Sequence, residues 1–152
     1  MTLYIEGNIS RYYAETLVLL FFPGSKFPED GSGGEPVVTM SVSCEGDSAV
    51  GKVTIKEKDR SVTKIYSPSE DTAKRVSSDM LIKLAAGGAM LAAGSDFCGT
   101  NPPWGMITGV RPAKMCLDML CGGASFEECV TRLCEDFLAS EKKSPPRRYD
   151  RL

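Results

Sequence analysis

The sequence predicts an α+β fold: a small antiparallel sheet of about four strands, with helices on one face and a C-terminal helix pair. Two observations lead to this prediction. Three successive runs of alternating, β-branched residues lie between residues 37 and 66, a pattern typical of an antiparallel meander with one solvated face. Apolar residues at helical spacing occur before these runs and again after them. The expected element order is β-α-β-β-β-α-α-α.

The N-terminal region is expected to form a strand, a helix and a loop. Residues 3–7 are a short apolar run that suits an edge strand. Ser10 offers an N-cap for a helix over residues 11–22, which a Pro-Gly pair then stops. Residues 26–36 are acidic and rich in glycine, so we expect a mobile surface loop there.

The three β-branched runs cover residues 37–44, 50–56 and 62–66. Turn sequences, Glu-Gly-Asp and Lys-Asp-Arg, separate them. In the second run Val53 and Ile55 alternate with polar residues, so one face of the sheet should be buried and the other solvated.

A long helix is expected next, from Ser67 to about Ala93. Ser67 can cap it, proline suits the first helical position, and Glu70 completes a capping box. Its second half contains only small residues over 85–89, and each of the two glycines there costs about 1 kcal/mol relative to alanine. We expect close approach of another backbone, from a strand or a helix, to compensate.

The C-terminal third holds an irregular segment, residues 101–114, and two helices. One helix is expected over residues 111–120, ending at two glycines, and the last opens with a second capping box at residues 125–128. We expect residues 1–143 to form a single α+β domain and residues 144–152 to be a disordered basic tail.

Composition excludes several classes of chemistry. The 152 residues include no histidine, which removes Ser-His-Asp and Cys-His catalysis and histidine-ligated zinc. The net charge of −2 gives no bulk electrostatic reason to expect nucleic-acid binding. No basic stretch precedes an apolar run near Met1, and the longest apolar run, residues 84–94, is shorter than the roughly 20 residues of a membrane span. We therefore expect a cytoplasmic protein with no membrane contact and reduced thiols.

The cysteines and carboxylates suggest no catalytic centre and no metal site. Four cysteines form two C-x4-C pairs, without the shorter gaps of zinc or iron–sulfur motifs, and are interpreted as small buried side chains, with metal binding or redox sensing as the alternatives. Cys98, placed in a loop, is the one expected to be exposed. Five carboxylates of the C-terminal helices lie off the apolar positions and should form a solvated face. The residues concerned are Cys116, Cys121, Cys129 and Cys134, and Asp118, Glu127, Glu128, Glu135 and Asp136.

The segment around Trp104, the only tryptophan, is the most informative. Arg111 and Lys114 fall in the first turn of the expected helix, where cations oppose the positive end of the helix dipole. Beside free backbone N–H groups they would suit a carboxylate or phosphate, from a ligand or a neighbouring domain. The alternative is that Arg111 pairs with a carboxylate of this chain and Trp104 fills the helix pair. The candidate anion or domain-contact residues are Trp104, Gly105, Thr108, Gly109, Arg111 and Lys114.

The string Pro-Pro-Trp-Gly-Met-Ile-Thr-Gly-Val-Arg-Pro-Ala-Lys, residues 102–114, resembles a signature of known proteins. It is similar to the stretch that closes the N-terminal domain of oxygen-independent coproporphyrinogen III oxidase-like proteins of the coproporphyrinogen dehydrogenase type, in the radical-SAM family. Residues 5–8, 11–13 and 21–24 also look similar, and the likeness extends to about Lys143. Seven motif positions match: Trp104, Gly105, Thr108, Gly109, Arg111, Pro112 and Lys114.

The resemblance implies the N-terminal region of an enzyme that uses S-adenosylmethionine and a [4Fe–4S] cluster to decarboxylate porphyrinogen propionates in haem synthesis. The family's C-x3-C-x2-C cluster motif belongs to a following barrel domain, and that spacing does not occur in this chain. The cofactors are therefore expected only in that catalytic domain, and no catalytic residue is carried over. Residues 144–152 do not resemble the family's helical continuation.

Two functional hypotheses follow. In the first, the chain is a non-catalytic accessory domain that docks on its own radical-SAM barrel or helps to hold an anionic substrate such as a porphyrinogen carboxylate. In the second, it is a stand-alone RNA- or protein-binding module, because five basic residues lie along the expected meander and five more in the tail. The meander residues are Lys52, Lys56, Lys58, Arg60 and Lys64.

Overall fold

The computed structural model describes residues 1–30, 32–102 and 112–138. The chain divides into two compact units, residues 1–101 and residues 102–152, which are described in turn. The expected tail, residues 144–152, lies outside the described part of the chain.

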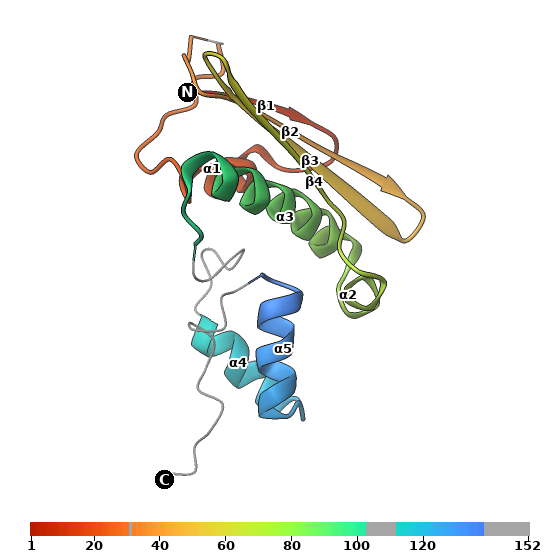
Figure 1. Cartoon of the computed structure of the whole chain (residues 1–152). Coiled ribbons are helices and arrows are strands. Elements are labelled where there is room, and N and C mark those ends of the chain that lie inside the picture. The colour runs from red at the N-terminus through yellow and green to blue at the C-terminus, as the bar shows by residue number, and fades with distance from the viewer. Residues whose placement is uncertain (31, 103–111, 139–152) are drawn as a thin grey trace. The chain divides into compact units, whose positions relative to one another are not determined.

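The first unit is built on a four-stranded sheet in the order β1-β2-β3-β4 (Figure 1). The strands are β1 (Thr2–Glu6), β2 (Val37–Glu45), β3 (Ser48–Glu57) and β4 (Arg60–Tyr66). The predicted α+β class and the antiparallel meander of β2, β3 and β4 are confirmed. The sheet is nevertheless mixed, because β1 pairs with β2 in parallel. The helix between these two strands carries the chain back across the sheet, which is the connection that a parallel pair requires.

Two helices, α1 (Arg11–Leu19) and α3 (Ser78–Cys98), cover one face of the sheet (Figure 1). Alternation along the strands produces this one-sided burial: Val53 and Ile55 of β3 are fully buried, whereas Lys52 and Lys56 are exposed on the other face. Ser10 caps α1 as predicted, its side chain accepting a hydrogen bond from the Tyr13 backbone N–H at 3.2 Å. The helix ends at Leu19, three residues before the predicted end.

The predicted single helix over residues 67–93 is wrong in two respects. It is two helices, α2 (Glu70–Arg75), capped by Ser69 and not Ser67, and then α3. Val76 adopts an extended conformation with φ −121° and ψ 160°, and Ser77 caps α3 by accepting from the Met80 N–H at 3.2 Å. A serine in position to cap offers the backbone an alternative to a continuous helix, which explains the break. The second helix then continues to Cys98, where Gly99 ends it at φ 72°.

The small residues of α3 are explained by close packing, as predicted. The Cα of Gly51 in β3 lies so near the Ala85 carbonyl group of α3 that a Cβ there would collide with backbone. Gly88 and Gly94 likewise lie against the rings of Tyr66 and Phe21. By length and composition α3 could also cross a membrane, but 61% of its apolar window is buried in this structure, as in the core helix of a globular fold.

The second unit contains α4 (Pro112–Cys121) and α5 (Phe126–Glu135). Gly123, with φ 97°, lies in the turn between them. The predicted cap at Ser125 is confirmed, because its side chain accepts from the Glu128 N–H at 3.1 Å. Cys116 of α4 is buried together with three residues of α5, which are Cys129, Val130 and Leu133.

The contact between Gly51 and α3 yields a prediction about stability. Gly51→Ala should lower the free energy of unfolding by about 1–3 kcal/mol, because the added methyl group meets backbone atoms that cannot rotate away. Urea denaturation followed by circular dichroism measures this change. Gly34→Ala is the matched control, since a Cβ there meets nothing within 4 Å, and it should stay within about 0.5 kcal/mol of the parent protein. Equal stabilities for the two variants would contradict the packing argument.

Candidate functional site

Most of the predicted anion site lies outside the described residues. Trp104, Gly105, Thr108, Gly109 and Arg111 all fall in residues 103–111, for which no structure is described. Their convergence on an anion therefore stays a prediction. Lys114 is the one candidate that the structure describes, and it is exposed in the first turn of α4.

The surroundings of Lys114 are consistent with an anion from elsewhere. The first turn of α4 contains no acidic residue, and no ion pair joins Lys114 to another residue in the described part of the chain. A cation at the positive end of a helix dipole is unfavourable unless an anion compensates it. A carboxylate or phosphate bound at this turn would gain from the ammonium group and the dipole together.

The helix pair holds its cysteines in different environments. Cys116 and Cys129 are buried, as predicted, with the Cys129 sulfur 3.9 Å from the Cys116 carbonyl oxygen. Burial raises the pKa of the Cys116 thiol, and the nearby Cys129 thiol raises it further. Cys134 is only half-buried, and Cys121 is exposed at the end of α4, contrary to the prediction that all four are buried. Cys121 is the last residue of α4, and Leu117 and Leu120 before it are exposed as well.

Cys98 and Cys44 also differ from expectation. Cys98 is the last residue of α3, half-buried, and not a loop residue, because α3 continues to the left-handed Gly99. Burial raises its thiol pKa, an effect that the charge of Arg60 partly opposes. Cys44, near the end of β2, is exposed although only Cys98 was expected to be. Cys98 and Cys44 both lie at or near the end of a helix or strand. Hydrophobic periodicity locates the ends of elements less accurately than their middles.

The five C-terminal carboxylates are exposed as predicted, with one exception. Asp136 retains only 3% of its exposure. It follows α5 directly, and its backbone N–H donates to the Arg132 carbonyl at 2.9 Å, so it continues the last turn beside buried residues. The apolar pattern of the expected helix does not predict that Asp136 is buried.

The five basic residues of the meander do not form one surface. Arg60 donates to the Asp96 carbonyl at 3.0 Å and lies 4.5 Å over the Phe97 ring. Lys64 pairs with the Asp96 carboxylate at 3.3 Å. Both contacts tie β4 to α3, while Lys52 and Lys56 stay on the open face of the sheet and Lys58 lies in the β3–β4 turn.

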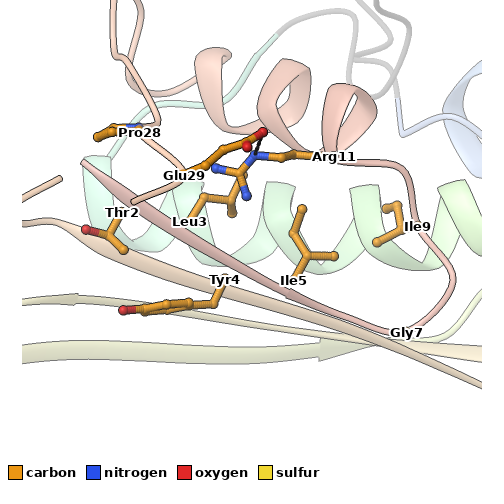
Figure 2. Close-up of a pocket in the computed structure, with 9 residues that line it drawn as sticks. All are labelled: Thr2, Leu3, Tyr4, Ile5, Gly7, Ile9, Arg11, Pro28 and Glu29. Carbon is orange, nitrogen blue, oxygen red and sulfur yellow. Dashed lines mark ion pairs between the residues drawn. The ribbon is translucent and has the colours of Figure 1, made fainter. Parts of the chain in front are cut away.

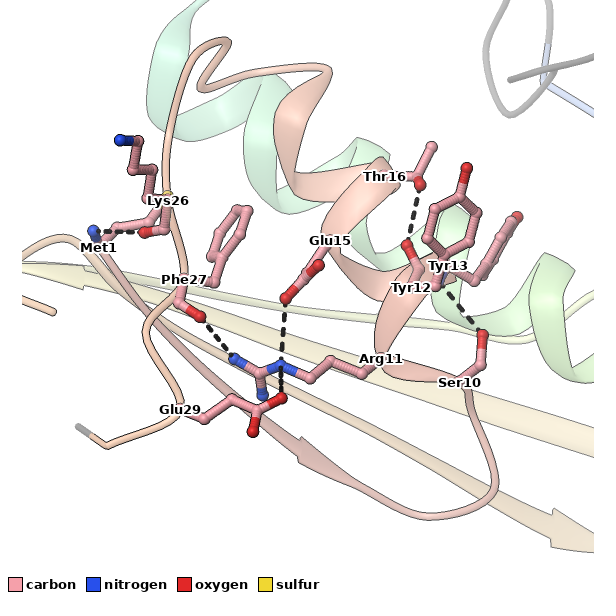
Figure 3. Close-up of polar contacts among 10 residues, drawn as sticks. All are labelled: Met1, Ser10, Arg11, Tyr12, Tyr13, Glu15, Thr16, Lys26, Phe27 and Glu29. Carbon is pink, nitrogen blue, oxygen red and sulfur yellow. Dashed lines mark hydrogen bonds and ion pairs between the residues drawn. The ribbon is translucent and has the colours of Figure 1, made fainter.

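A groove of about 440 Å³ along β1 was not indicated by the sequence (Figure 2). It runs beside the outer edge of the strand, below the start of α1. Arg11 crosses it, with its Nε 3.1 Å from Glu15 and 4.0 Å from Glu29, and its Nη2 donates to the Phe27 carbonyl at 3.3 Å (Figure 3). Only the Arg11–Glu15 pair has a sequence signal, its i,i+4 spacing. The lining residues are Thr2, Leu3, Tyr4, Ile5, Gly7, Ile9, Arg11, Pro28 and Glu29.

A second groove, of about 530 Å³, lies between the β2–β3 turn and the helices α2 and α3. Its apolar part includes Leu81 and Ile82, and its acidic part includes Glu45, Asp47 and Glu70. The two sides come from segments more than 20 residues apart in sequence, so local patterns do not reveal it.

Within the described residues, no group of three or more cysteine, aspartate or glutamate side chains could hold a metal ion. Two of the four helical thiols are buried in the helix pair, and Cys121 points to solvent. Compared with family models, curated proteins and solved structures, the chain has no match.

Differential burial of the thiols yields the second prediction. Under native conditions an alkylating reagent should modify Cys44 and Cys121 first and Cys98 more slowly, whereas Cys116 and Cys129 should react only after unfolding. Timed iodoacetamide quenching and peptide mass spectrometry measure the order. Cys121→Ser and Cys44→Ser serve as controls, because each should remove one fast site and leave the others unchanged. Rapid native modification of Cys129 would contradict the described helix packing.

Proposed function

We propose that this chain is a non-catalytic N-terminal accessory domain of a radical-SAM coproporphyrinogen III oxidase-like enzyme of haem biosynthesis. It docks on the catalytic barrel or helps to hold the anionic substrate. The observation that carries this proposal is the position of the motif that resembles the family: residues 102–114 begin where the first compact unit ends, at Asn101.

The first unit already has a core supplied by its own elements. Leu3, Leu17, Met40, Ile55 and Leu84 come from five different strands and helices of that unit, and all are buried. A segment with a proline pair, a tryptophan and two cations is suited to contact another domain or a ligand.

The chemistry of residues 111 and 114 matches a carboxylate-rich substrate. Arg111 can hold a carboxylate through two parallel hydrogen bonds, and the exposed Lys114 adds a second positive charge. Coproporphyrinogen carries four propionate groups, so it presents several carboxylates to these two cations.

Binding of coproporphyrin III, the stable oxidised form of the substrate, tests the anion site. Trp104 is the only tryptophan and lies in the motif, so its fluorescence reports on this segment alone. Coproporphyrin should quench it in a saturable, salt-sensitive manner. Arg111→Ala together with Lys114→Ala should weaken binding by about tenfold or more, because each charge-assisted contact contributes about 1.5–3 kcal/mol.

Lys52→Ala together with Lys56→Ala is the matched control. It removes the same charge from exposed positions on the open face of the sheet and should leave the affinity unchanged. If quenching is absent, or if both double variants weaken it equally, the motif does not hold the anion. Activity of the full-length enzyme in the Arg111 and Lys114 double variant then tests the docking role separately.

The coding sequence beyond codon 152 provides an independent prediction. Read in all three frames, it should encode a C-x3-C-x2-C motif within about a hundred codons, the beginning of a barrel of ordinary domain size. Direct sequencing of the locus measures this. A stop codon with no such motif in any frame would contradict the accessory-domain proposal.

A stand-alone binding module remains the second candidate, on one observation. Lys52 and Lys56 share the open sheet face with Tyr4, whose surface is 56% exposed. An aromatic ring beside cations on a sheet suits single-stranded RNA. Glu6 lies on the same face, however, and Arg60 and Lys64 are held by α3. A gel-shift assay with single-stranded RNA at low salt should show no complex; a salt-sensitive complex that Lys52→Ala and Lys56→Ala abolish would favour this candidate instead.

A further inference from the structure

Two cysteines meet inside the helix pair of the second unit, between α4 and α5 (Figure 1). Cys116 of α4 retains only 6% of its exposure, and Cys129 of α5 retains none. The Cys129 S–H donates to the Cys116 carbonyl oxygen at 3.9 Å, although the two residues are 13 positions apart in sequence. The Cys129 thiol also raises the pKa of the Cys116 thiol, so each group lies within electrostatic reach of the other. The two thiols are therefore neighbours in the folded chain.

Helix geometry separates this pair from the other two cysteines of the helices. Each residue of an α-helix turns the chain by about 100°, so two cysteines five positions apart lie about 140° apart around the helix axis. Cys121 of α4 and Cys134 of α5 each follow a buried cysteine at this spacing. Cys121 is accordingly exposed, and Cys134 is half-buried. The C-x4-C spacing thus places one cysteine of each helix inside the pair and turns the other away from it.

The buried environment does not stabilise the thiolate form of these cysteines. Burial is the main cause of the raised pKa of the Cys116 thiol. A disulfide is easily reduced where the protein stabilises the thiolate that reduction releases, and it resists reduction where the protein does not. A disulfide between Cys116 and Cys129 would therefore persist once formed. The same burial shields both thiols while the helices are packed, so the reaction requires local opening of the pair.

The helix pair has a small core that a covalent bond would strengthen. Within residues 112–138, the buried apolar side chains are those of Cys116, Cys129, Val130 and Leu133. Small cores benefit most from a covalent link. A bond between Cys116 and Cys129 would close a short ring around the turn that contains Gly123 and would remove chain entropy from the opened state. It would hold α4, the helix that carries Lys114, against α5.

We propose that Cys116 and Cys129 form a reversible disulfide that holds the α4–α5 pair closed under oxidising conditions. While the pair is open, one cysteine thiolate attacks a low-molecular-weight disulfide, R–S–S–R, forms a mixed disulfide and releases RS⁻. The second cysteine thiolate then displaces the remaining R–S group as RS⁻ and forms the protein disulfide. Two protein thiols thereby lose two electrons, and one R–S–S–R is reduced to two R–SH, which take up the two thiol protons. This device does not depend on the proposed role in haem synthesis.

Disulfide mapping on the full chain tests the proposal. The protein is equilibrated without denaturant at several ratios of oxidised to reduced glutathione, and the free thiols are then blocked with N-ethylmaleimide in urea. Trypsin alone leaves both cysteines in the peptide of residues 115–132, so a glutamate-specific protease must also cut after Glu127 or Glu128. We expect linked peptides that contain Cys116 and Cys129 and that dithiothreitol separates. In the oxidised protein, amide exchange at Val130 and Leu133 should slow by about tenfold or more, because the cross-link restricts local opening.

One variant and its matched control identify the bond that matters. Cys129→Ala should abolish both the link and the slower exchange, whereas Cys121→Ala, at an exposed position of the same helix pair, should leave both unchanged. Mapping on the parent protein keeps the test valid even if Cys129→Ala fails to fold.

Three results would overturn the proposal. The first is the absence of a Cys116–Cys129 link at every glutathione ratio. The second is a link from either residue to Cys121 or Cys134 in its place. The third is a Cys116–Cys129 link that forms with a loss of helical circular dichroism, because the bond would then not fit the folded helix pair.

Discussion

The contact between Gly51 of β3 and the Ala85 backbone of α3 is the constraint on which the first unit depends. It brings a 21-residue helix so close to the sheet that the middle of the helix, from Leu84 to Leu91, is buried. The helix residues from Ala85 to Ala89 are small because larger side chains would hold the two backbones apart. The two glycines in this stretch lower helix stability through their conformational entropy. The burial that they permit opposes this loss, because apolar area removed from water contributes about 25 cal/mol per Å².

Several other features follow from the position of α3. The Phe21 ring, just after α1, packs on Gly94, and the Tyr66 ring of β4 packs on Gly88. Each ring fits against α3 only because the glycine beneath it has no side chain. Arg60 and Lys64 of β4 reach Asp96 and Phe97 at the end of the same helix. The helices thereby cover one face of the sheet. Of the residues that resemble a basic stripe in sequence, Arg60 and Lys64 contact α3, whereas Lys52 and Lys56 lie on the open face.

Sequence patterns predicted the parts of this fold that depend on local chemistry. Alternation along β3, the caps at Ser10 and Ser125, and the close approach at the small residues of α3 all followed from single residues and their spacing. What they did not predict depends on competition or on distant segments. The break at Val76 depends on Ser77 capping a second helix instead of continuing the first, and the parallel pairing of β1 depends on α1 crossing the sheet.

In the candidate site, too, features set by local sequence were predictable and features set by distant segments were not. The exposure of Lys114 was predictable, because it lies in the polar first turn of a short helix. The burial of Asp136 was not, because it depends on how the chain turns after α5. The β1 groove was also beyond local patterns, since Arg11, Glu29 and the strand edge come together only in the folded chain.

The proposed anion site makes a specific physical demand on its ligand. The motif at residues 102–114 would offer charge to an anion, so its affinity should depend mainly on ionic strength and on two cations.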